Sequence, residues 1–259
     1  MGESVLIEKK DGVGLIFLNE PDSRNALSVA IKEGLMKALD ELDRDPGIKV
    51  LLIAGKGRAF CAGGDLRTMG NNQTFFEAKS RMDDSSRVVK KIISINKPVI
   101  AAVHGYAVGA GFSLALACDL IVAEEGAKFG LAFKNIGLIP DLGLHYFLTK
   151  TTSPWKVKEW IWTGAMISAE EGWRFGFVNR LVPEGQGLSC AEDLARELAQ
   201  GPLKAYALTK SILRQAATLQ LENVLELESY GQSALRQTKD HQEGVQAFRE
   251  KRPPRFIGE

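Results

Sequence analysis

Two glycine-rich segments hold the residues with the most evident chemical use. The first spans residues 55–66 (GKGRAFCAGGDL) and the second spans residues 104–113 (HGYAVGAGFS). Each follows a short apolar run typical of a buried strand, and each is too rich in glycine for the interior of a packed element. The second also opens a helix, whose first amide groups have no partner within the helix. Two loops with free N–H groups can converge on one oxygen.

A purely structural role for these glycines is the alternative, because tight turns and close helix–strand packing explain most single glycine-rich loops. Neither segment ends in the Gly-Lys-Ser/Thr of a Walker phosphate loop. Neither has the dinucleotide spacing with an acidic residue about 20 positions later. The sequence therefore predicts that the protein uses no nicotinamide.

Asp141 lies within residues 137–143 (GLIPDLG). From the local sequence alone it is more simply a helix N-cap, because Pro140-Asp141 opens an apolar segment. His145 follows four residues later. An ordinary i,i+4 contact on a helix is the simpler interpretation of this spacing, and a shift of the Asp141 pKa by His145 is the functional alternative. Ser113 lacks the glycine-flanked turn that carries a hydrolase nucleophile. It is more simply a serine on an apolar helix whose hydroxyl is hydrogen-bonded.

Composition and charge exclude several classes of protein. The chain has 259 residues, of which 45% are hydrophobic, and a net charge of +1, so a sizeable core is expected and nothing favours a nucleic-acid or membrane partner. No apolar run reaches the roughly 18 to 20 residues that span a bilayer. Scattered histidines and cysteines predict neither a metal site nor disulfides. With no leader or peroxisomal signal evident, we expect a cytoplasmic protein. The scattered histidines and cysteines are His104, His145, His241, Cys61, Cys118 and Cys190.

The alternation of strand and helix patterns predicts an α/β fold with a mainly parallel core. Alternating or wholly apolar runs predict strands over residues 5–9, 13–18, 50–54, 99–103 and 120–123. Helical spacing follows Ser28, at Ile31, Leu35, Leu39 and Leu42, and a small-residue helix is expected over about residues 109–118.

After Pro140 the pattern is mostly helical, with one strand-like segment at residues 177–182. Gly201-Pro202 breaks the helices there, and we expect a core domain over residues 1–200 and a C-terminal helical region over residues 201–259. The apolar faces of that region must pack on the core or on another subunit. The expected helices cover residues 191–200, 203–217, 221–235 and 240–250.

The order of several short motifs resembles the enoyl-CoA hydratase/isomerase (crotonase) family over nearly the whole chain. The motifs are residues 24–27 (RNAL), 59–66 (AFCAGGDL), 105–111, 118–119, 129–130, 137–140 (GLIP) and 248–256. The resemblance implies a spiral core of repeated ββα turns and a C-terminal helical region that builds trimers, often paired into hexamers. It also implies that CoA arrives as part of the substrate, an acyl-CoA thioester, with no separate cofactor.

By position in the family, the amides of Gly64 and Ala110 correspond to an oxyanion hole for the thioester carbonyl. Hydratases of the family use two glutamates, whose positions are taken here by Ser113 and Phe133. Asp141 resembles the acidic residue of the isomerase branches, including the enoyl and ring-epoxide isomerases of aromatic-acid degradation. One carboxylate suffices to move a proton along an acyl chain, so the resemblance favours an isomerase.

The resemblance also implies which residues contact the substrate. For each Lys and Arg among them, the alternative is a charged side chain that is simply exposed to solvent. Three other functions stay open: a hydratase with unusual acid–base residues, a dehalogenase, and a non-catalytic acyl-CoA-binding homologue. The dehalogenase is disfavoured because no histidine lies in residues 74–95, and the presence of Asp141 argues against the non-catalytic homologue. The expected contact residues are Arg24, Ala26, Ala62, Gly64, Asp65, Leu66, Arg67, Ala110, Phe133, Lys210, Phe248 and Lys251.

Overall fold

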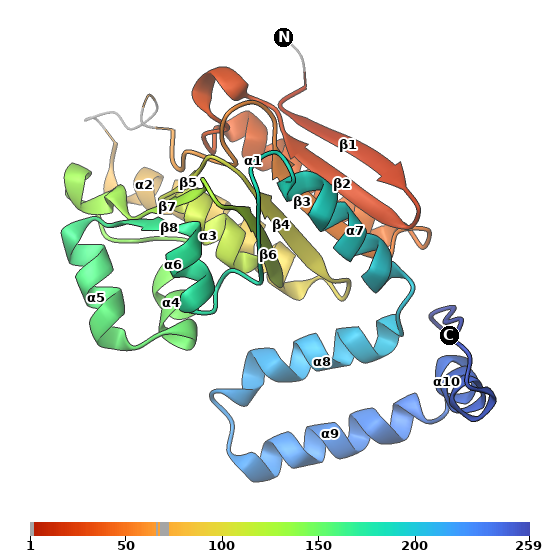
Figure 1. The fold of residues 1–259 in the computed structure, drawn as a ribbon. Coiled ribbons are helices and arrows are strands. Elements are labelled where there is room, and N and C mark those ends of the chain that lie inside the picture. The colour runs from red at the N-terminus through yellow and green to blue at the C-terminus, as the bar shows by residue number, and fades with distance from the viewer. Residues whose placement is uncertain (1–2, 66, 68–72) are drawn as a thin grey trace.

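A computed structural model describes residues 3–65, 67 and 73–259. Its centre is a six-stranded sheet in the order β1-β2-β3-β4-β6-β9 (Figure 1). The β1–β2 hairpin is antiparallel and every later neighbour pairs in parallel, which confirms the α/β class and the mainly parallel core. The strands are β1 (Val5–Lys10), β2 (Val13–Leu18), β3 (Val50–Gly55), β4 (Val99–Val103), β6 (Leu120–Glu124) and β9 (Arg180–Val182).

The central strands are buried on both faces, as their unbroken apolar sequences require. Successive side chains point to opposite faces, so Leu15 and Phe17 join one core cluster while Ile16 and Leu18 join the other. Helix α7 (Gly187–Ala199) covers the first face. The opposite face is covered by α1 (Val29–Arg44), α2 (Phe75–Ser94) and α3 (Ala110–Ala117).

Helix α1 follows its predicted pattern closely. The Ser28 hydroxyl accepts a hydrogen bond from the Ile31 amide at 3.1 Å and caps the helix. The four apolar positions predicted for one face are all buried, and Asp45 is the C-cap residue. The local sequence and the tertiary packing therefore agree for this element.

A second, three-stranded sheet is absent from the sequence-based prediction. It has the order β5-β7-β8, with β5 and β7 parallel and β7 and β8 antiparallel. Each strand has three residues, which is too short to show a periodic pattern, and β8 lies in the region predicted to be helical apart from residues 177–182. The strands are β5 (Tyr106–Val108), β7 (Lys128–Gly130) and β8 (Met166–Ser168).

The predicted strand at residues 177–182 is shorter than expected, because only β9 pairs. Phe177 and Val178 instead enter the core, where the Phe177 ring lies 5.3 Å from that of Phe112 and 5.2 Å from that of Phe129. Helix α7 begins at Gly187 rather than at residue 191. The remaining elements beside the core are η1 (Pro21–Ser23), η3 (Ala132–Ile136), α4 (Leu144–Thr151), α5 (Pro154–Thr163) and α6 (Ala169–Arg174).

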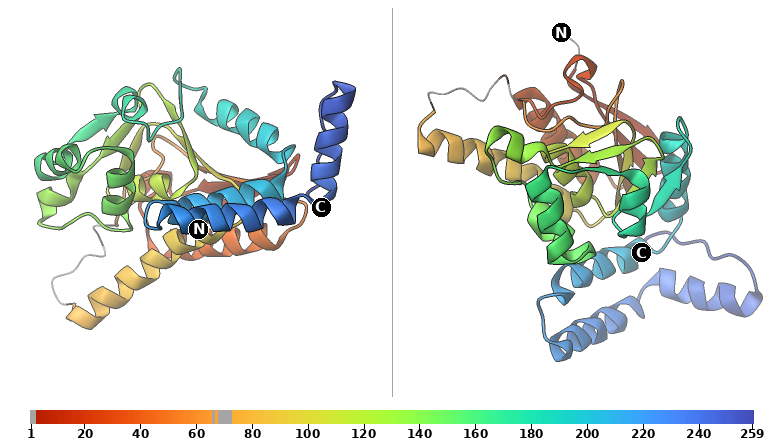
Figure 2. Two further views of the ribbon diagram at one scale, coloured as in Figure 1. Left: turned by 90° about the horizontal axis from the view of Figure 1, so that it is seen from below. Right: turned by 60° about the vertical axis from the view of Figure 1, so that its left-hand side comes forward.

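The C-terminal helices α8 (Leu203–Ala216), α9 (Leu221–Leu235) and α10 (Lys239–Glu250) extend away from the sheet (Figures 1 and 2). Both α8 and α9 are described in full, and neither contains a buried residue. The Lys210 ammonium holds α8 to the core through the Asp119 carboxylate at 2.7 Å. The division into domains at residues 200 and 201 stays a prediction.

Within the described part of the chain, no helix combines the length and apolar character needed to cross a membrane.

Replacing Gly111 with alanine is expected to lower the free energy of unfolding by about 1–3 kcal/mol, because a Cβ there would lie 2.3 Å from the Cys61 carbonyl oxygen. The control is Gly231→Ala, also within a helix, where the nearest atom to the new Cβ is 3.7 Å away. This control should be neutral or stabilising by about 0.5–1 kcal/mol. Urea unfolding measures both variants, and equal effects would contradict the close packing around Gly111.

Candidate active site

The two glycine-rich segments pack against each other backbone to backbone. The Cys61 amide donates to the Tyr106 carbonyl at 3.0 Å, and the Val108 amide donates to the Cys61 carbonyl at 2.9 Å. A Cβ on Gly63 would lie 2.4 Å from the Val108 carbonyl oxygen and 3.3 Å from the Ala110 nitrogen. Since no real Cβ tolerates such a contact with rigid backbone, only glycine allows the first loop to approach the start of α3 so closely.

The amides of Gly64 and Ala110 therefore lie on backbone segments that are direct neighbours. Ala110 is the first residue of α3, so its N–H has no acceptor within the helix. Among the described residues, neither amide donates to a backbone carbonyl of the loops, although the amides of Cys61 and Ala62 do. The arrangement leaves both N–H groups available for an added acceptor such as a thioester oxygen.

The segment around Arg24 is fastened to the first glycine-rich loop. The Ala62 amide donates to the Arg24 carbonyl at 2.9 Å, and the Leu27 amide donates to the Gly63 carbonyl at 2.7 Å. Arg24 itself is left-handed, with φ of 53°, and exposed, while Ala26 is buried. The structure therefore brings Arg24, Ala26, Ala62 and Gly64 together, as the motifs predicted.

Asn25 organises this region, although the sequence analysis did not single it out. Its side chain is fully buried, and its amide nitrogen donates to the carbonyls of Lys56 at 2.9 Å and Ala59 at 2.8 Å. Its side-chain oxygen accepts the Glu20 amide at 2.9 Å. Asn25 could have been identified as a polar residue placed between a turn and the apolar Ala26. A side-chain amide buried at such a place needs several hydrogen-bond partners and so tends to hold neighbouring segments together.

Asp141 carries the most perturbed carboxyl group near these loops. Its Oδ1 is buried and has no hydrogen-bond partner among the described residues. Burial raises the pKa of Asp141 from 3.8 to about 6, a rise reduced in part by a hydrogen bond from its own backbone. A carboxyl group with this pKa changes protonation state near neutral pH, which suits an acid–base catalyst.

The interpretation of Asp141 as a helix cap is wrong. Helix α4 begins at Leu144, its N-cap residue is Gly143, and no side chain caps it. Asp141 thus lies before the helix, and His145 lies within its first turn, so the two are not an i,i+4 pair on one helix. His145 is exposed.

Ser113 and Phe133, which occupy the positions of the hydratase glutamates in the resemblance, both lie beside this site. The Ser113 hydroxyl donates to the backbone carbonyl of Asp141 at 2.9 Å. Phe133, on η3, is 8% exposed, and its ring lies 3.6 Å from where a Cβ on Gly109 would be. An aromatic ring therefore covers the residue next to Ala110.

Asp65 and Arg67 pair with each other. The Arg67 guanidinium donates to both Asp65 carboxylate oxygens, at 2.8 and 3.0 Å, and this ion pair lowers the pKa of Asp65. The Arg67 side chain stays 70% exposed. Contacts of these two residues with CoA stay predictions, and Leu66 lies outside the described residues.

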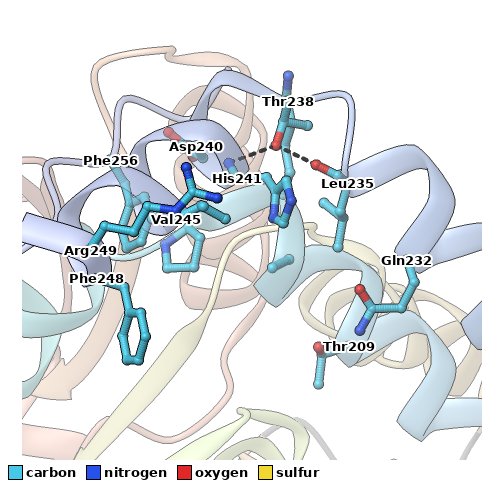
Figure 3. Close-up of a pocket in the computed structure, with 14 residues that line it drawn as sticks. Thr209, Gln232, Leu235, Thr238, Asp240, His241, Val245, Phe248, Arg249 and Phe256 are labelled. Carbon is cyan, nitrogen blue, oxygen red and sulfur yellow. Dashed lines mark hydrogen bonds between the residues drawn. The ribbon is translucent and has the colours of Figure 1, made fainter.

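The structure does not bring the C-terminal candidates to Gly64 and Asp141 within one chain. Lys210 binds Asp119, which follows the carboxyl end of α3, whereas Ala110 starts that helix. Phe248 and Lys251 lie at the end of α10, apart from α3 and α4 in all views (Figures 1 and 2). Phe248 is 86% exposed and lines a cavity of about 630 Å³ between α8, α9 and α10 (Figure 3). Their contacts with CoA stay predictions for an assembled oligomer.

Among the described residues, no group of three or more His, Cys, Asp and Glu side chains is placed to hold a metal ion. The Cys61 thiol is fully buried, and burial raises its pKa to about 12. This thiol stays protonated at neutral pH, which agrees with the interpretation of Cys61 as a small buried residue.

Comparison with known proteins gives the family of this chain. Residues 8–259 match the enoyl-CoA hydratase/isomerase family. A 1,2-epoxyphenylacetyl-CoA isomerase of Escherichia coli is 34% identical over 261 residues, covering 100% of both chains. A 2,3-dehydroadipyl-CoA hydratase of the same organism is also 34% identical, over 254 residues and 98% of both chains.

The fold is equally well matched. The crystal structure of an enoyl-CoA hydratase from Polaromonas sp. JS666 superimposes with a TM-score of 0.94 at 32% identity, covering 98% of this chain and 99% of the other. The chain therefore belongs to the enoyl-CoA hydratase/isomerase family and has the crotonase fold. Because an isomerase and a hydratase are equally similar to it, overall identity does not select the reaction.

Replacing Asp141 with asparagine is expected to stabilise the protein above pH 7. The raised pKa means that the folded state holds the proton more tightly than the unfolded state, so stability falls as pH rises from about 4 through about 6. One pKa unit corresponds to about 1.4 kcal/mol, so the ionised carboxyl costs up to about 3 kcal/mol. Thermal unfolding should give the variant a higher melting temperature than wild type at pH 8, and the difference should be much smaller at pH 5. A less stable variant at pH 8 would indicate an unrecognised partner for the carboxylate.

Proposed function

We propose that the protein is an enoyl-CoA isomerase that moves a double bond along the acyl chain through a single carboxylate. Ionised Asp141 removes the acidic proton from the carbon α to the thioester of a β,γ-enoyl-CoA. The electron pair delocalises into a dienolate, and the same carboxyl group returns the proton to the γ carbon. The product is the α,β-enoyl-CoA, and neither water nor redox chemistry is consumed.

The observation that carries this proposal is the isolated carboxyl group of Asp141. Efficient general bases have a pKa near the working pH, and burial raises this one to about 6. A base that must also act as an acid towards the γ carbon needs to hold the proton briefly, which an ordinary exposed aspartate does poorly.

The dienolate requires a place for its negative charge. The amides of Gly64 and Ala110 are the proposed donors, and the positive end of the α3 dipole adds to the field at Ala110. Each preorganised donor of this kind contributes roughly 2.7–4 kcal/mol to transition-state stabilisation. Alanine at position 110 changes nothing here, because the donor is a backbone group.

Hydration is the second candidate, favoured by the relatives that are named hydratases. Addition of water requires groups that orient and deprotonate the water molecule. Ser113 already donates to the Asp141 carbonyl, and Phe133 offers no polar atom. A hydratase would have to rely on Asp141 alone, so the geometry supports isomerisation better. The presence of Asp141 also disfavours a binding protein without catalytic activity.

We further propose that CoA is part of the substrate and that catalysis uses neither metal nor nicotinamide. Backbone amides supply the expected oxyanion stabilisation, and one carboxyl group transfers the proton. Each proposed step is therefore carried out by a group of this chain. The exposed Arg24 and Arg67 are the proposed contacts for CoA phosphates, since guanidinium groups bind phosphate well.

Asp141→Asn is expected to reduce kcat for conversion of a β,γ-enoyl-CoA by roughly two orders of magnitude or more, which is the contribution of a positioned general base. Affinity for acyl-CoA should stay close to that of wild type, because the oxyanion donors are unchanged. Product mass separates the two reactions, since isomerisation leaves it unchanged and hydration adds one water. A wild-type enzyme that hydrates an α,β-enoyl-CoA rapidly but does not shift a β,γ double bond would refute the proposal.

We also propose that the chain assembles as a homotrimer or as a hexamer of two trimers. The support is the apolar surface left on the C-terminal helices, where Leu213, Leu221, Leu225 and Tyr230 are 54–69% exposed. Such a surface in water favours association. Analytical ultracentrifugation is expected to give three or six times the 28.3 kDa mass of the chain. A stable monomer that retains full activity would count decisively against this assembly.

A further inference from the structure

Ser113 makes a contact with Asp141 that its position in an apolar helix does not require. It is fully buried in α3, and its hydroxyl oxygen lies 2.9 Å from the Asp141 carbonyl but 3.4 Å from the carbonyl of Gly109 in its own helix. A hydroxyl has one proton to donate. The shorter contact therefore directs that proton across to the loop that carries Asp141, rather than back into the helix as is usual for a helical serine.

The loop that receives this hydrogen bond has an unusual backbone. Leu142 has φ of 50° and Gly143 has φ of 87°, so two left-handed residues follow Asp141 in succession. A leucine in this region is uncommon and persists only where surrounding contacts hold it. The Leu142 side chain is buried, and the Leu144 amide donates to the same Asp141 carbonyl at 3.1 Å. Two donors thus hold one carbonyl at the start of the turn.

The carboxyl group of Asp141 has less support, since its Oδ1 has no hydrogen-bond partner among the described residues and its other hydrogen bond comes from its own backbone. Its direction must therefore come mainly from its backbone. We propose that Ser113 is a positioning residue, which fixes the carboxyl group of Asp141 in the site through the hydrogen bond to the Asp141 carbonyl. This inference rests on the proposed role of Asp141 as the proton carrier.

The position of Ser113 along α3 gives the contact its significance. Ala110, whose amide is a proposed oxyanion donor, is the first residue of the helix, and Ser113 follows three residues later. That separation is close to one turn, a rise of about 4.5 Å. One short rigid helix thus supplies an oxyanion donor from its first residue and anchors the base from its first turn. The distance between the stabilised oxygen and the base is then set by the helix geometry.

Two variants test the role of Ser113. Ser113→Ala removes the donor, and Ser113→Cys keeps a side chain of similar size with a much weaker donor, so a loss shared by both reflects the hydrogen bond and not a cavity. We expect kcat to fall roughly 10- to 100-fold in each, the scale of effect of a small misplacement of a reacting group. KM should be unchanged, because the acyl-CoA contacts remain.

The control is Cys118→Ala, at the C-cap of the same helix. Its thiol is buried like the Ser113 hydroxyl, and among the described residues it donates a hydrogen bond only to the Leu114 carbonyl of that helix, at 3.5 Å. This variant should keep the wild-type kcat and KM. A loss of activity equal to that of the Ser113 variants would overturn the proposal, because it would show that any loosening of α3 has the same effect.

A second measurement does not depend on activity. Carboxyl NMR titration should give Asp141 a pKa near 6 in wild type, because burial raises it, and a lower value in both Ser113 variants, because a freed loop lets water reach the carboxyl group. An unchanged pKa together with kcat within twofold of wild type would overturn the positioning role. If wild type shows no isomerase activity but the pKa still falls in the variants, the proposed function fails while the anchor stands.

Discussion

The structure depends on the direct contact between two glycine-rich backbones. Gly63 and Gly111 lie so close to the carbonyls of Val108 and Cys61 that a Cβ on either would stand 2.3–2.4 Å from an oxygen. This approach brings Gly64 next to the first residue of α3 and orients the loop whose other side Asn25 holds through its buried amide. The sheet, with apolar clusters on both faces, is the rigid support from which both loops emerge. A side chain at either glycine would force these two backbones apart.

Asp141 illustrates the opposing requirements of stability and chemistry. A buried carboxyl oxygen without a partner costs stability once it is ionised, and the raised pKa expresses that cost. A stabilising partner, such as a lysine, would lower the pKa and make the carboxylate a poorer base near neutral pH. The site is thus stabilised through its backbone, by the hydrogen bond from Ser113 and the turn at Leu142, while Oδ1 of Asp141 has no hydrogen-bond partner among the described residues.

Much of the fold could be predicted from the sequence, for reasons visible in particular elements. The strand β3 is a wholly apolar run, and α1 has both a regular spacing and the Ser28 cap. The strands β5, β7 and β8 could not be predicted, because three residues show no period and their pairing is decided by distant segments. The resemblance of motifs singled out Gly64, Ala110 and Asp141, whose catalytic roles stay predictions. It could not show that Asp141 precedes the helix rather than capping it, since that difference depends on the left-handed Leu142.

The same oxyanion arrangement can serve either reaction of the family, so the polar groups around it must determine which one occurs. Hydration needs a held water molecule, and isomerisation needs a proton carrier that reaches two carbons in a dry site. In this chain Phe133 packs over Gly109 and Ser113 is committed to a backbone carbonyl. Neither side chain is charged, and the Ser113 hydroxyl donates to the backbone carbonyl of Asp141. On the proposed function, isomerisation therefore depends on Asp141 and on the absence of a charged group at positions 113 and 133.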